Sequence, residues 1–299
     1  MTNTGNVIAV DWGTSRFRAY LVDARGICDR VASNDGISAA AGGDFAGILR
    51  RNCGRWMDIA PNAPVIMAGM VGSRNGWREV PYAACPASLA DIARGLETVE
   101  IAPGRAASIV PGVLCRSDGV ADVMRGEEAL AFGTQAENGI IVIPGTHSKW
   151  IRMESGRIAE FRSFLTGEVY GLLRHQSILR LLAEEPEDEA GLERGFAAAD
   201  RAGGPLHQTF EARTGVLDGT LPAAQVGPFL SGLLIATELK DGHQMLDGAT
   251  SLTLVADGAL ADNYRKAFER RLIEIAAAEP ESCLATGLKR IVEASARAR

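Results

Sequence analysis

The sequence predicts an α/β protein made of two related halves. Along its 299 residues, short apolar stretches alternate with amphipathic stretches of helical period, the order typical of α/β folds. Two segments, IAVDWGTSRFRAYLVD at 8–23 and IIVIPGTHSKWIRM at 140–153, repeat one pattern of strand, small polar loop and strand. A turn, a third short strand and a helix follow each of them, so each half is expected to open β-β-β-α.

The composition argues against several classes of protein. Apolar residues make up 46% and charged residues 23% of the chain, which are values of a globular protein. A net charge of −6 argues against a nucleic-acid-binding surface. The start, MTNTGN, lacks the basic and apolar regions of a signal peptide, and the most apolar window, 229–239, is too short to cross a membrane. Five cysteines without a CxxC pair are expected to be reduced thiols of a cytoplasmic protein.

The elements of the first half follow in order. The turn DARG at 23–26 leads into the third strand, and an amphipathic helix is expected at roughly 44–58. VIMAGMVGSRNGW at 65–77 indicates a buried strand that enters a Gly-Ser-Arg loop. SIVPGV at 108–113 predicts another short strand, and VADVMRGEEALAFG predicts a helix over 120–133.

The second half is expected to contain a helix at roughly 167–183, followed by an acidic helix end or loop at 183–191. A long apolar helix over about 222–239 belongs either to the core or to a dimer contact. SLTLVADGAL at 251–260 indicates a strand that enters a glycine turn, with a helix behind it, and SCLATGLKRIVEASA closes the chain as a helix. The turn near 134–139 predicts domains at 1–135 and 136–282, the first completed by the last helix at about 283–297.

The two loops have the residue types of a phosphate site. Glycine lets the backbone approach a ligand closely, and turn N–H groups and hydroxyls donate to phosphate oxygens. Asp11 would repel phosphate unless a cation lies between them, so it is predicted to bind Mg²⁺ directly or through water, as a catalytic metal ligand. The alternative for Asp11 is an Asx turn. The other predicted contacts of the loops are Gly13, Thr14 and Ser15 in the first and Gly145, Thr146 and Ser148 in the second.

Two residues of the second loop have open roles. Lys149 is either a cation for phosphate or a strand residue with its head in solvent. His147 either donates to a phosphate oxygen or caps the turn. The second loop has Pro144 where the first has Asp11, so metal handling is expected in the first loop and direct phosphate contact in the second.

The duplicated hairpins resemble those of the sugar-kinase, actin and heat-shock chaperone ATPase superfamily. Its members have two actin-like (ribonuclease H-like) domains that flank an ATP cleft, and a strand-Gly-helix adenosine motif. Here VADGALADNYRKAF matches that motif with Asp257 and Gly258, and the last helix resembles the closing helix of the fold. The resemblance implies ATP and Mg²⁺ as cofactors. No GxxxxGK[ST] or GxGxxG occurs, so a P-loop or dinucleotide fold has no support.

Six motifs in order make the resemblance closer. They are AVDWGTSRFRAYL, MAGMVGSRNGW, CPA, DVMRGEE, PGTHSKW and LTGE, and they are similar to the 2-dehydro-3-deoxygalactonokinase family. That family phosphorylates the terminal (C6) hydroxyl of 2-dehydro-3-deoxy-D-galactonate with ATP, giving the 6-phosphate and ADP, in galactonate catabolism. The resemblance implies a sugar-acid site in the first domain and a nucleotide site in the second. The sequence departs from the wider superfamily at Pro144 and Asp257.

Phosphoryl transfer needs one group that accepts the proton of the attacking hydroxyl. In related sugar kinases an aspartate at the start of a helix has this role, and the resemblance assigns it to Asp122, with Asp118 as the reserve. The alternative for Asp122 is a helix N-cap. Arg125 either holds the substrate or pairs with Glu128.

A substrate with a carboxylate and a 2-keto group requires donors. Arg74 is the best candidate, because a guanidinium binds a carboxylate with two parallel hydrogen bonds. Ser73 and the backbone of Gly72 lie beside it, and Trp77 is either an apolar wall of the pocket or a core residue. Glu168 either contacts sugar hydroxyls or caps its helix.

Two other functions remain open from the sequence. The acceptor is alternatively another 2-keto-3-deoxy acid, such as the gluconate epimer. The chain is alternatively an actin-like ATPase switch without kinase activity. The expected partners are small molecules, with no nucleic acid and no membrane, and a homodimer is left open.

Overall fold

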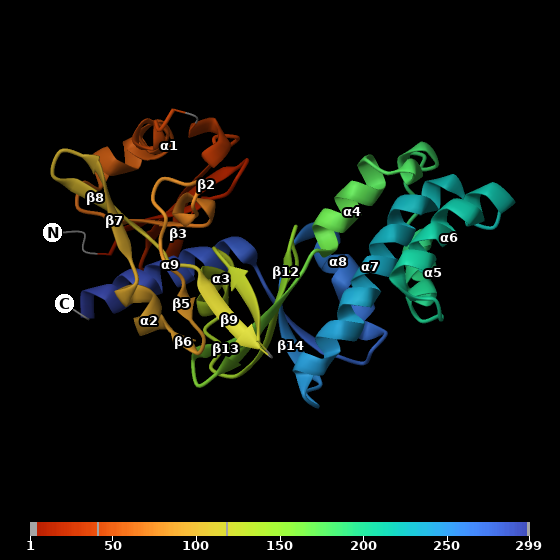
Figure 1. Ribbon diagram of the computed structural model, residues 1–299. Helices are drawn as coiled ribbons and strands as arrows, with labels where there is room; N and C mark the ends of the chain where they lie inside the picture. The colour runs from red at the N-terminus through yellow and green to blue at the C-terminus, as the bar shows by residue number, and fades with distance from the viewer. Residues whose placement is uncertain (1–4, 41, 118, 298–299) are drawn as a thin grey trace. The chain divides into compact units, whose positions relative to one another are not determined.

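The computed structural model describes residues 5–40, 42–117 and 119–297 (Figure 1). The chain forms two compact units. Unit 1 comprises Met1–Asn138, Ile151–Phe161 and Ala278–Arg299, and unit 2 comprises Gly139–Trp150 and Arg162–Ala277. This division assigns 151–161 to unit 1, whereas the sequence expectation placed that segment in the second domain.

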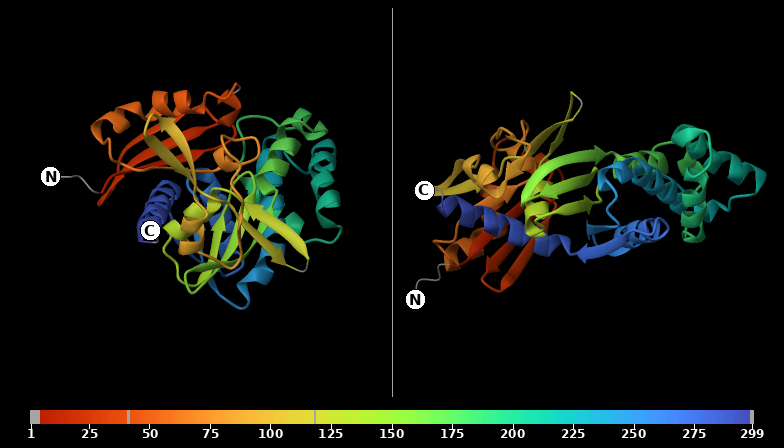
Figure 2. Two further views of the ribbon diagram at one scale, coloured as in Figure 1. Left: turned by 60° about the vertical axis from the view of Figure 1, so that its left-hand side comes forward. Right: turned by 90° about the horizontal axis from the view of Figure 1, so that it is seen from below.

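Unit 1 is built on a six-stranded sheet of order β3-β2-β1-β4-β8-β7. Strand β1 pairs antiparallel with β2 and parallel with β4. All of β1 except the half-buried Asp11 is buried, which indicates that both faces of the sheet are covered. Helices α1 and α9 supply these covers on opposite faces (Figure 2). The bounds are β1 Val7–Trp12, β2 Phe17–Asp23, β3 Gly26–Ser33, β4 Val65–Ala68, β7 Glu97–Ala102, β8 Arg105–Ile109, α1 Phe45–Ile59 and α9 Pro280–Arg297.

The predicted β-β-β-α opening is therefore confirmed in unit 1, but the helix predicted over 120–133 is wrong in its first half. Residues Val113–Ser117 (β9) and Val120–Met124 (β10) form an antiparallel hairpin, and β5 (Ala83–Ala84) pairs with β9. Helix α3 spans only Glu127–Gly133, because Gly126 before it has a φ of 114°, outside the helical region. The β-branched residues of VADVM favour the strand.

Helix α3 packs directly on α9 through glycines. A Cβ on Gly133 would lie 1.7 Å from the Cys283 carbonyl oxygen, and a Cβ on Gly287 would lie 1.8 Å from that of Ala129. The small residues of the closing helix thus let the two backbones touch.

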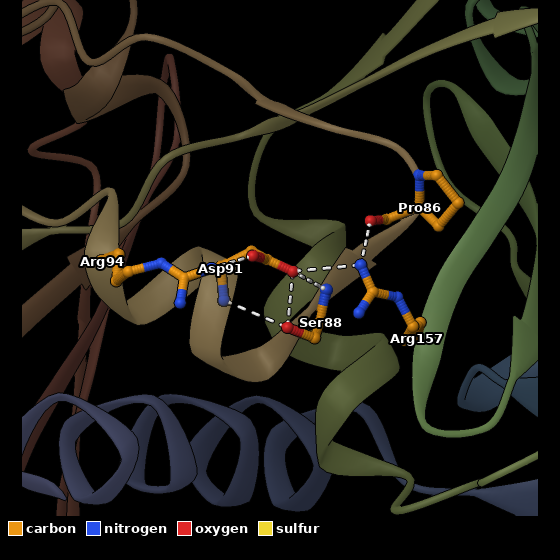
Figure 3. A network of polar contacts seen from close by, with 5 residues as sticks. All are labelled: Pro86, Ser88, Asp91, Arg94 and Arg157. Atoms are coloured by element: carbon orange, nitrogen blue, oxygen red, sulfur yellow. Dashed lines mark hydrogen bonds and ion pairs between the residues drawn. The ribbon is translucent and has the colours of Figure 1, made fainter. Parts of the chain in front are cut away.

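A polar network also orders unit 1 around α2 (Leu89–Arg94), next to β6 (Ala87–Ser88). Ser88 and Asp91 form a reciprocal capping box at the helix start. Arg157, from 151–161, donates to the Pro86 carbonyl oxygen at 2.7 Å and to Asp91 at 3.3 Å (Figure 3). These bonds tie the segment 151–161 to α2.

The remaining sheet has the order β15-β14-β11-β12-β13-β6, and the division between the units passes through β12 and β13. The β-β-β-α opening predicted for the second half of the chain is also confirmed. The predicted strand over 251–260 is confirmed for Ser251–Val255, whereas β15 occupies part of the stretch expected to be helix behind it. The bounds are β11 Gly139–Ile143, β12 Ser148–Glu154, β13 Arg157–Phe164, β14 Ser251–Val255 and β15 Glu274–Ala278.

Unit 2 places its helices around α7 (Val226–Gly242), whose residues are mostly buried. The apolar window 229–239 is therefore core, and not a dimer contact. Helix α5 crosses α7 closely, since a Cβ on Gly195 would lie 2.1 Å from the Phe229 carbonyl oxygen. Helix α4 is shorter than predicted, and α5 and α6 were not predicted. The bounds are α4 Thr166–His175, α5 Ala190–Ala199, α6 Gly204–Asp218 and α8 Gly258–Glu269.

Single 3₁₀ turns complete the chain at Ile37–Ala40, Met70–Gly72, Ile178–Leu181, Ala223–Gln225 and His243–Leu246. None of the helices in the described part of the chain combines the length and hydropathy that a bilayer span requires.

Candidate active site

The carboxylate of Asp11 sits near the end of β1 in unit 1 and is paired. Arg18, opposite it on β2, donates to Asp11 Oδ2 from Nη2 at 2.7 Å and from Nε at 3.1 Å. Burial raises the pKa of Asp11, the Arg18 guanidinium lowers it, and the nearby charge of Glu127 raises it again. A metal ion at Asp11 would take the place of part of this pairing. Within the described ranges, no group of three or more His, Cys, Asp or Glu side chains is arranged to hold a metal ion.

The first loop is held by its backbone. Gly13 N–H donates to the Arg16 carbonyl at 2.9 Å, and the Gly13 and Thr14 carbonyls accept from Ile37 and Ser38. A Cβ on Gly36 would lie 2.3 Å from the Thr14 oxygen, so this contact requires glycine. The side chains of Thr14 and Ser15 are exposed. The loop therefore offers hydroxyls to solvent from a fixed backbone.

Glycines bring β1, β4 and α3 together at one point. Gly69 has a φ of +92°, and a Cβ there would lie 3.0 Å from the Trp12 carbonyl oxygen and 3.3 Å from Asp11 Oδ1. A Cβ on Gly126 would lie 3.4 Å from the Gly69 Cα. The first residues of α3, Glu127 and Glu128, are thereby brought to the end of β1.

The two glutamates differ in their surroundings. Glu127 accepts from the Arg125 N–H at 3.0 Å, and its charge reaches Asp11. Glu128 is fully buried and accepts from the Gly126 N–H at 2.7 Å, while its Oε1 has no hydrogen-bond partner among the described residues. Burial, with the charge of Glu127, raises the pKa of Glu128 to about 8. The sequence motif MRGEE contains both residues, but its helix start was predicted seven residues too early.

Asp122 does not begin a helix, which corrects the expectation on which its role was based. It lies half-buried on β10, opposite Cys115, and its Oδ1 accepts a hydrogen bond from the Val123 N–H at 2.7 Å. Asp118, the reserve, lies outside the described residues.

The loop after β4 presents Arg74. This side chain is exposed and has no ion-pair or hydrogen-bond partner among the residues that the structure describes. The Ser73 hydroxyl donates to the Met70 carbonyl at 2.7 Å, so it stabilises its own turn. Trp77 stacks on Phe45 with ring centroids 5.6 Å apart, which makes it part of the core.

Arg125 makes no ion pair with Glu128 in the described part of the chain. Its Nη2 donates to the Val80 carbonyl at 2.8 Å, and its guanidinium lies 4.3 Å from the centre of the Tyr82 ring. Nε and Nη1 are buried and lack hydrogen-bond partners among the described residues. These unused donors beside Gly72 suit an anionic ligand.

In unit 2, the start of α4 packs against the second loop. Glu168 N–H donates to the Thr146 carbonyl at 2.9 Å, and a Cβ on Gly167 would lie 2.3 Å from the Gly145 oxygen. His147 Nε2 lies 2.5 Å from Glu168 Oε2, and both side chains are half exposed. His147 and Glu168 therefore join the loop to its helix.

Ser148 and Lys149 are buried, unlike Thr146 and His147. The Lys149 ammonium donates to the His147 carbonyl at 3.2 Å, so its head is not in solvent. Ser148 Oγ shares a hydrogen bond of 3.0 Å with the Tyr264 hydroxyl. Both side chains have partners inside unit 2, which sequence periodicity did not indicate.

A cavity of about 450 Å³ lies wholly in unit 2. Two of the predicted loop residues, Gly145 and Thr146, line it. Asp257 and Gly258 immediately precede the lining residues of α8, and Gly258 has a φ of +59°. The other lining residues are Thr166, Gly167, Tyr170, Glu187, Glu189, Pro228, Ser231, Leu234, Ile235, Ala259, Leu260, Asn263 and Tyr264. Several of these lie in segments that the sequence did mark: LTGE, VADGALADNYRKAF and the acidic run at 183–191. The sequence carried no signal of a site for Tyr170, Pro228, Ser231, Leu234 and Ile235.

Comparisons with known proteins agree with this architecture. A solved structure from Sinorhizobium meliloti, described provisionally as a 2-dehydro-3-deoxygalactonokinase, superposes with a TM-score of 0.85 at 30% identity and 98% coverage of both chains. A more distant likeness, with a TM-score of 0.56 at 12% identity, is to the activator of 2-hydroxyisocaproyl-CoA dehydratase from Clostridium difficile, covering 98% of this chain and 97% of that one. The expected α/β fold of two actin-like domains is confirmed.

Sequence relatives point to one family. The 2-dehydro-3-deoxygalactonokinase of Escherichia coli K12 is 34% identical over 300 residues, which cover 98% of this chain and 99% of that protein. The family model described as 2-keto-3-deoxy-galactonokinase matches residues 11–291. The chain belongs to the 2-keto-3-deoxy-galactonokinase family.

Proposed function

We propose that the protein transfers the γ-phosphate of ATP to the C6 hydroxyl of 2-dehydro-3-deoxy-D-galactonate, giving the 6-phosphate and ADP. Family membership supports the reaction. The single structural observation that carries the nucleotide part is the cavity of about 450 Å³ beside the second loop, a volume typical of small-molecule sites. Nucleotide binding is thereby assigned to unit 2, and sugar-acid binding to unit 1.

Helix α4 suggests how the nucleotide is oriented. Its first turn, at Gly167, adjoins Gly145 and Thr146, where N–H groups and the helix dipole favour phosphate. Arg174 is about 10 Å further along this helix and holds Glu187, a cavity residue, from Nε at 3.1 Å. A carboxylate repels the negative charge of a phosphate group, but it accepts hydrogen bonds from hydroxyl groups. The phosphates therefore belong near Gly145, and the ribose belongs near Glu187.

Mg²⁺ is proposed to bind on the side of unit 1, at Asp11. The carboxylate chemistry suits this ion, and Glu127 lies close enough for its charge to act on Asp11. When bound, Mg²⁺ would neutralise charge on the transferred phosphoryl group. Gly13, Thr14 and Ser15 are proposed to contact the same phosphate from a loop whose backbone is already fixed. Lys149, buried at the start of β12, is proposed to act on phosphate indirectly, by holding the His147 carbonyl and with it the backbone of the second loop.

For the proton acceptor we favour Glu127, because the helix start expected at Asp122 lies at Glu127 instead. Asp122 stays the alternative. Glu127→Gln should lower turnover by roughly 10²-fold or more, the typical contribution of a base, with ATP affinity kept, whereas Asp122→Asn should lower it only a few-fold. The reverse order would return the role to Asp122.

The sugar acid is proposed to lie against Arg74 and Arg125, whose free donors suit its carboxylate and keto group. Ser73 is proposed to contribute to sugar-acid binding by stabilising the turn that carries Arg74, since its hydroxyl already donates to the Met70 carbonyl. Glu168 is proposed to place His147 and not to bind sugar, because the two side chains are already in contact. Arg74→Ala should raise KM for the acid more than KM for ATP.

The test of the proposed function is ADP release from Mg·ATP with a panel of 2-keto-3-deoxy sugar acids. Turnover with the galactonate form, above that with the gluconate form and the blank without acceptor, supports the proposal. Preference for the gluconate form would change the substrate, and turnover independent of any acceptor would indicate an ATPase switch. A homodimer and a cytoplasmic location stay predictions from the sequence.

A further inference from the structure

A buried carboxylate in unit 2, Glu238 on α7, has no part in the chemistry above. Its residue is 2% exposed. No lysine or arginine pairs with it within the ranges that the structure describes. Burying a carboxylate without a counter-ion costs several kcal/mol, roughly, unless hydrogen bonds replace its water.

Three side chains donate to Glu238 and occupy both of its oxygens. Trp150 Nε1 donates to Oε1 at 2.9 Å. The Tyr264 hydroxyl donates to Oε2 at 2.6 Å, and the Thr166 hydroxyl donates to the same oxygen. Burial raises the pKa of Glu238, and these hydrogen bonds act in the opposite direction. The carboxylate is thus matched by donors from three other elements.

The direction of one further hydrogen bond follows from these. With Glu238 ionised, Tyr264 gives its proton to the carboxylate, and the 3.0 Å contact between Ser148 Oγ and the Tyr264 hydroxyl is then made with the proton of Ser148. The protons therefore run from Ser148 to Tyr264 to Glu238. Ser148, expected from the sequence to donate to phosphate, has no hydroxyl proton left for a ligand.

Two of the three donors to Glu238 belong to the walls of the cavity, and the third lies on a strand that follows a lining loop. Thr166 and Tyr264 line the cavity directly, from α4 and α8. Ser148 and Trp150 are on β12, immediately after the lining residues Gly145 and Thr146. One carboxylate on α7 thereby joins β12, α4 and α8 at the positions where these elements meet the cavity.

We propose that Glu238 is a positioning residue for nucleotide binding. It accepts the hydroxyl protons of Thr166 and Tyr264 and so turns them away from the cavity. It also holds the elements that form the cavity walls in fixed positions. The inference rests on the proposed binding of nucleotide in unit 2. With their protons committed, these two hydroxyls offer the cavity only lone pairs. They can accept a hydrogen bond from a donor group of the ligand, and they cannot donate one to a phosphate oxygen, so donation to phosphate is left to the N–H groups around Gly145.

The main test is Glu238→Gln, which keeps the size of the side chain but replaces one acceptor with an N–H donor that opposes the surrounding donors. Binding of Mg·ADP, measured by calorimetry, should weaken about tenfold, the effect of roughly 1.4 kcal/mol. KM for ATP should rise similarly, while kcat at saturating ATP and KM for the sugar acid stay within about twofold of wild type. Thr237→Val is the matched control, because among the described residues the Thr237 hydroxyl bonds only to the Leu233 carbonyl of its own helix.

Thr166→Ser and Thr166→Val test the proposal if Glu238→Gln fails to fold. Serine keeps the hydroxyl that donates to Glu238, so Thr166→Ser should bind Mg·ADP more tightly than Thr166→Val. In a folded Glu238→Gln background the effect of Thr166→Val should shrink, since the neutral amide oxygen of glutamine accepts the Thr166 proton more weakly than a carboxylate oxygen does.

Three results would overturn the proposal: a folded Glu238→Gln variant with unchanged Mg·ADP affinity, equal affinities for the two Thr166 variants, or an effect of Thr166→Val of the same size in both backgrounds. Mg·ADP binding needs no acceptor. Absence of acceptor-dependent turnover in the wild type would therefore reject the kinase reaction and leave this test intact.

Discussion

At the scale of single residues, a glycine constrains the backbone at the end of β1. Gly69 combines a left-handed φ of +92° with contacts to Trp12 and Asp11 that leave no room for a Cβ. Arg18 then fixes the Asp11 carboxylate from the neighbouring strand. The position of the proposed metal ligand thus depends on a glycine that sequence periodicity does not mark as functional.

Gly69→Ala should cost about 2–3 kcal/mol of unfolding free energy, because backbone strain and a 3.0 Å contact add. Turnover should also fall, since relief of the contact moves Asp11. Gly104→Ala is the control: Gly104 has a φ of +74° but nothing lies within 4 Å of a Cβ there. It should cost only about 1 kcal/mol and leave turnover unchanged. Urea unfolding of both variants measures the difference, and equal costs would contradict the role of the contact.

Glu128 predicts a pH dependence of stability. Its pKa is raised from 4.5 to about 8 in the folded protein, so the folded state keeps a proton that the unfolded state releases. Its contribution to stability is complete below pH 4.5 and is lost as the pH rises through about 8. Glu128→Gln, which stays neutral, should flatten the fall in unfolding free energy across this window. An unchanged slope would show that another group causes the loss.

At the scale of elements, the cavity depends on how α4 holds the acidic segment that follows it. Arg174 is buried and donates two hydrogen bonds. Its Nη2 donates to Glu185 Oε1 at 2.5 Å, and its Nε donates to Glu187 Oε1 at 3.1 Å. A Cβ on Gly227 would lie 2.0 Å from Glu187 Oε1, so the start of α7 also shapes this contact. The acidic run, expected only to be a solvated loop or helix end, supplies part of the cavity wall.

Arg174→Ala should raise KM for ATP about five- to tenfold with little change in kcat, because it releases Glu187 from the proposed ribose contact while leaving the phosphate loop intact. The loss should be smaller for dATP if Glu187 accepts from the 2′-hydroxyl. Arg180→Ala, at an exposed position of the next turn, is the control and should change neither value. Equal effects of Arg174→Ala on KM for ATP and for the sugar acid would point to a general defect in folding.

At the scale of the whole molecule, the two substrates are proposed to bind in different units. The cavity residues all belong to unit 2, whereas Arg74, Arg125 and the α3 glutamates belong to unit 1. Each ligand should therefore stabilise its own unit, because a ligand stabilises the state that it binds.

Hydrogen exchange with one ligand at a time tests this assignment. Mg·ADP alone should protect amides at 145–146, 166–170, 228–235 and 259–264, which carry the cavity residues. At about 100 times Kd the local gain is about 2.7 kcal/mol, roughly a hundredfold in exchange rate. The sugar acid alone should instead protect 69–77 and 120–128. Protection by Mg·ADP confined to unit 1 would refute the assignment.

The sequence by itself determined the parts that depend on neighbouring residues. Strand-loop-strand patterns located both hairpins, helical periodicity located α1, α7 and α9, and six motifs in order indicated the family. The helix over 120–133 was wrong because a glycine with a left-handed φ breaks the pattern before Glu127, and local periodicity does not record φ.

Only the tertiary structure decided which polar groups face a ligand. Thr146 and Ser148 are two residues apart in one loop, yet the first is exposed at the cavity and the second is buried against Tyr264, which follows 116 residues later. In the sequence, Glu238 only interrupts an apolar helix. In the structure, Trp150, Thr166 and Tyr264 donate hydrogen bonds to its carboxylate. The physical reason is that burial and hydrogen-bond direction depend on partners brought together by folding, whereas strand and helix patterns depend on residues adjacent in the chain.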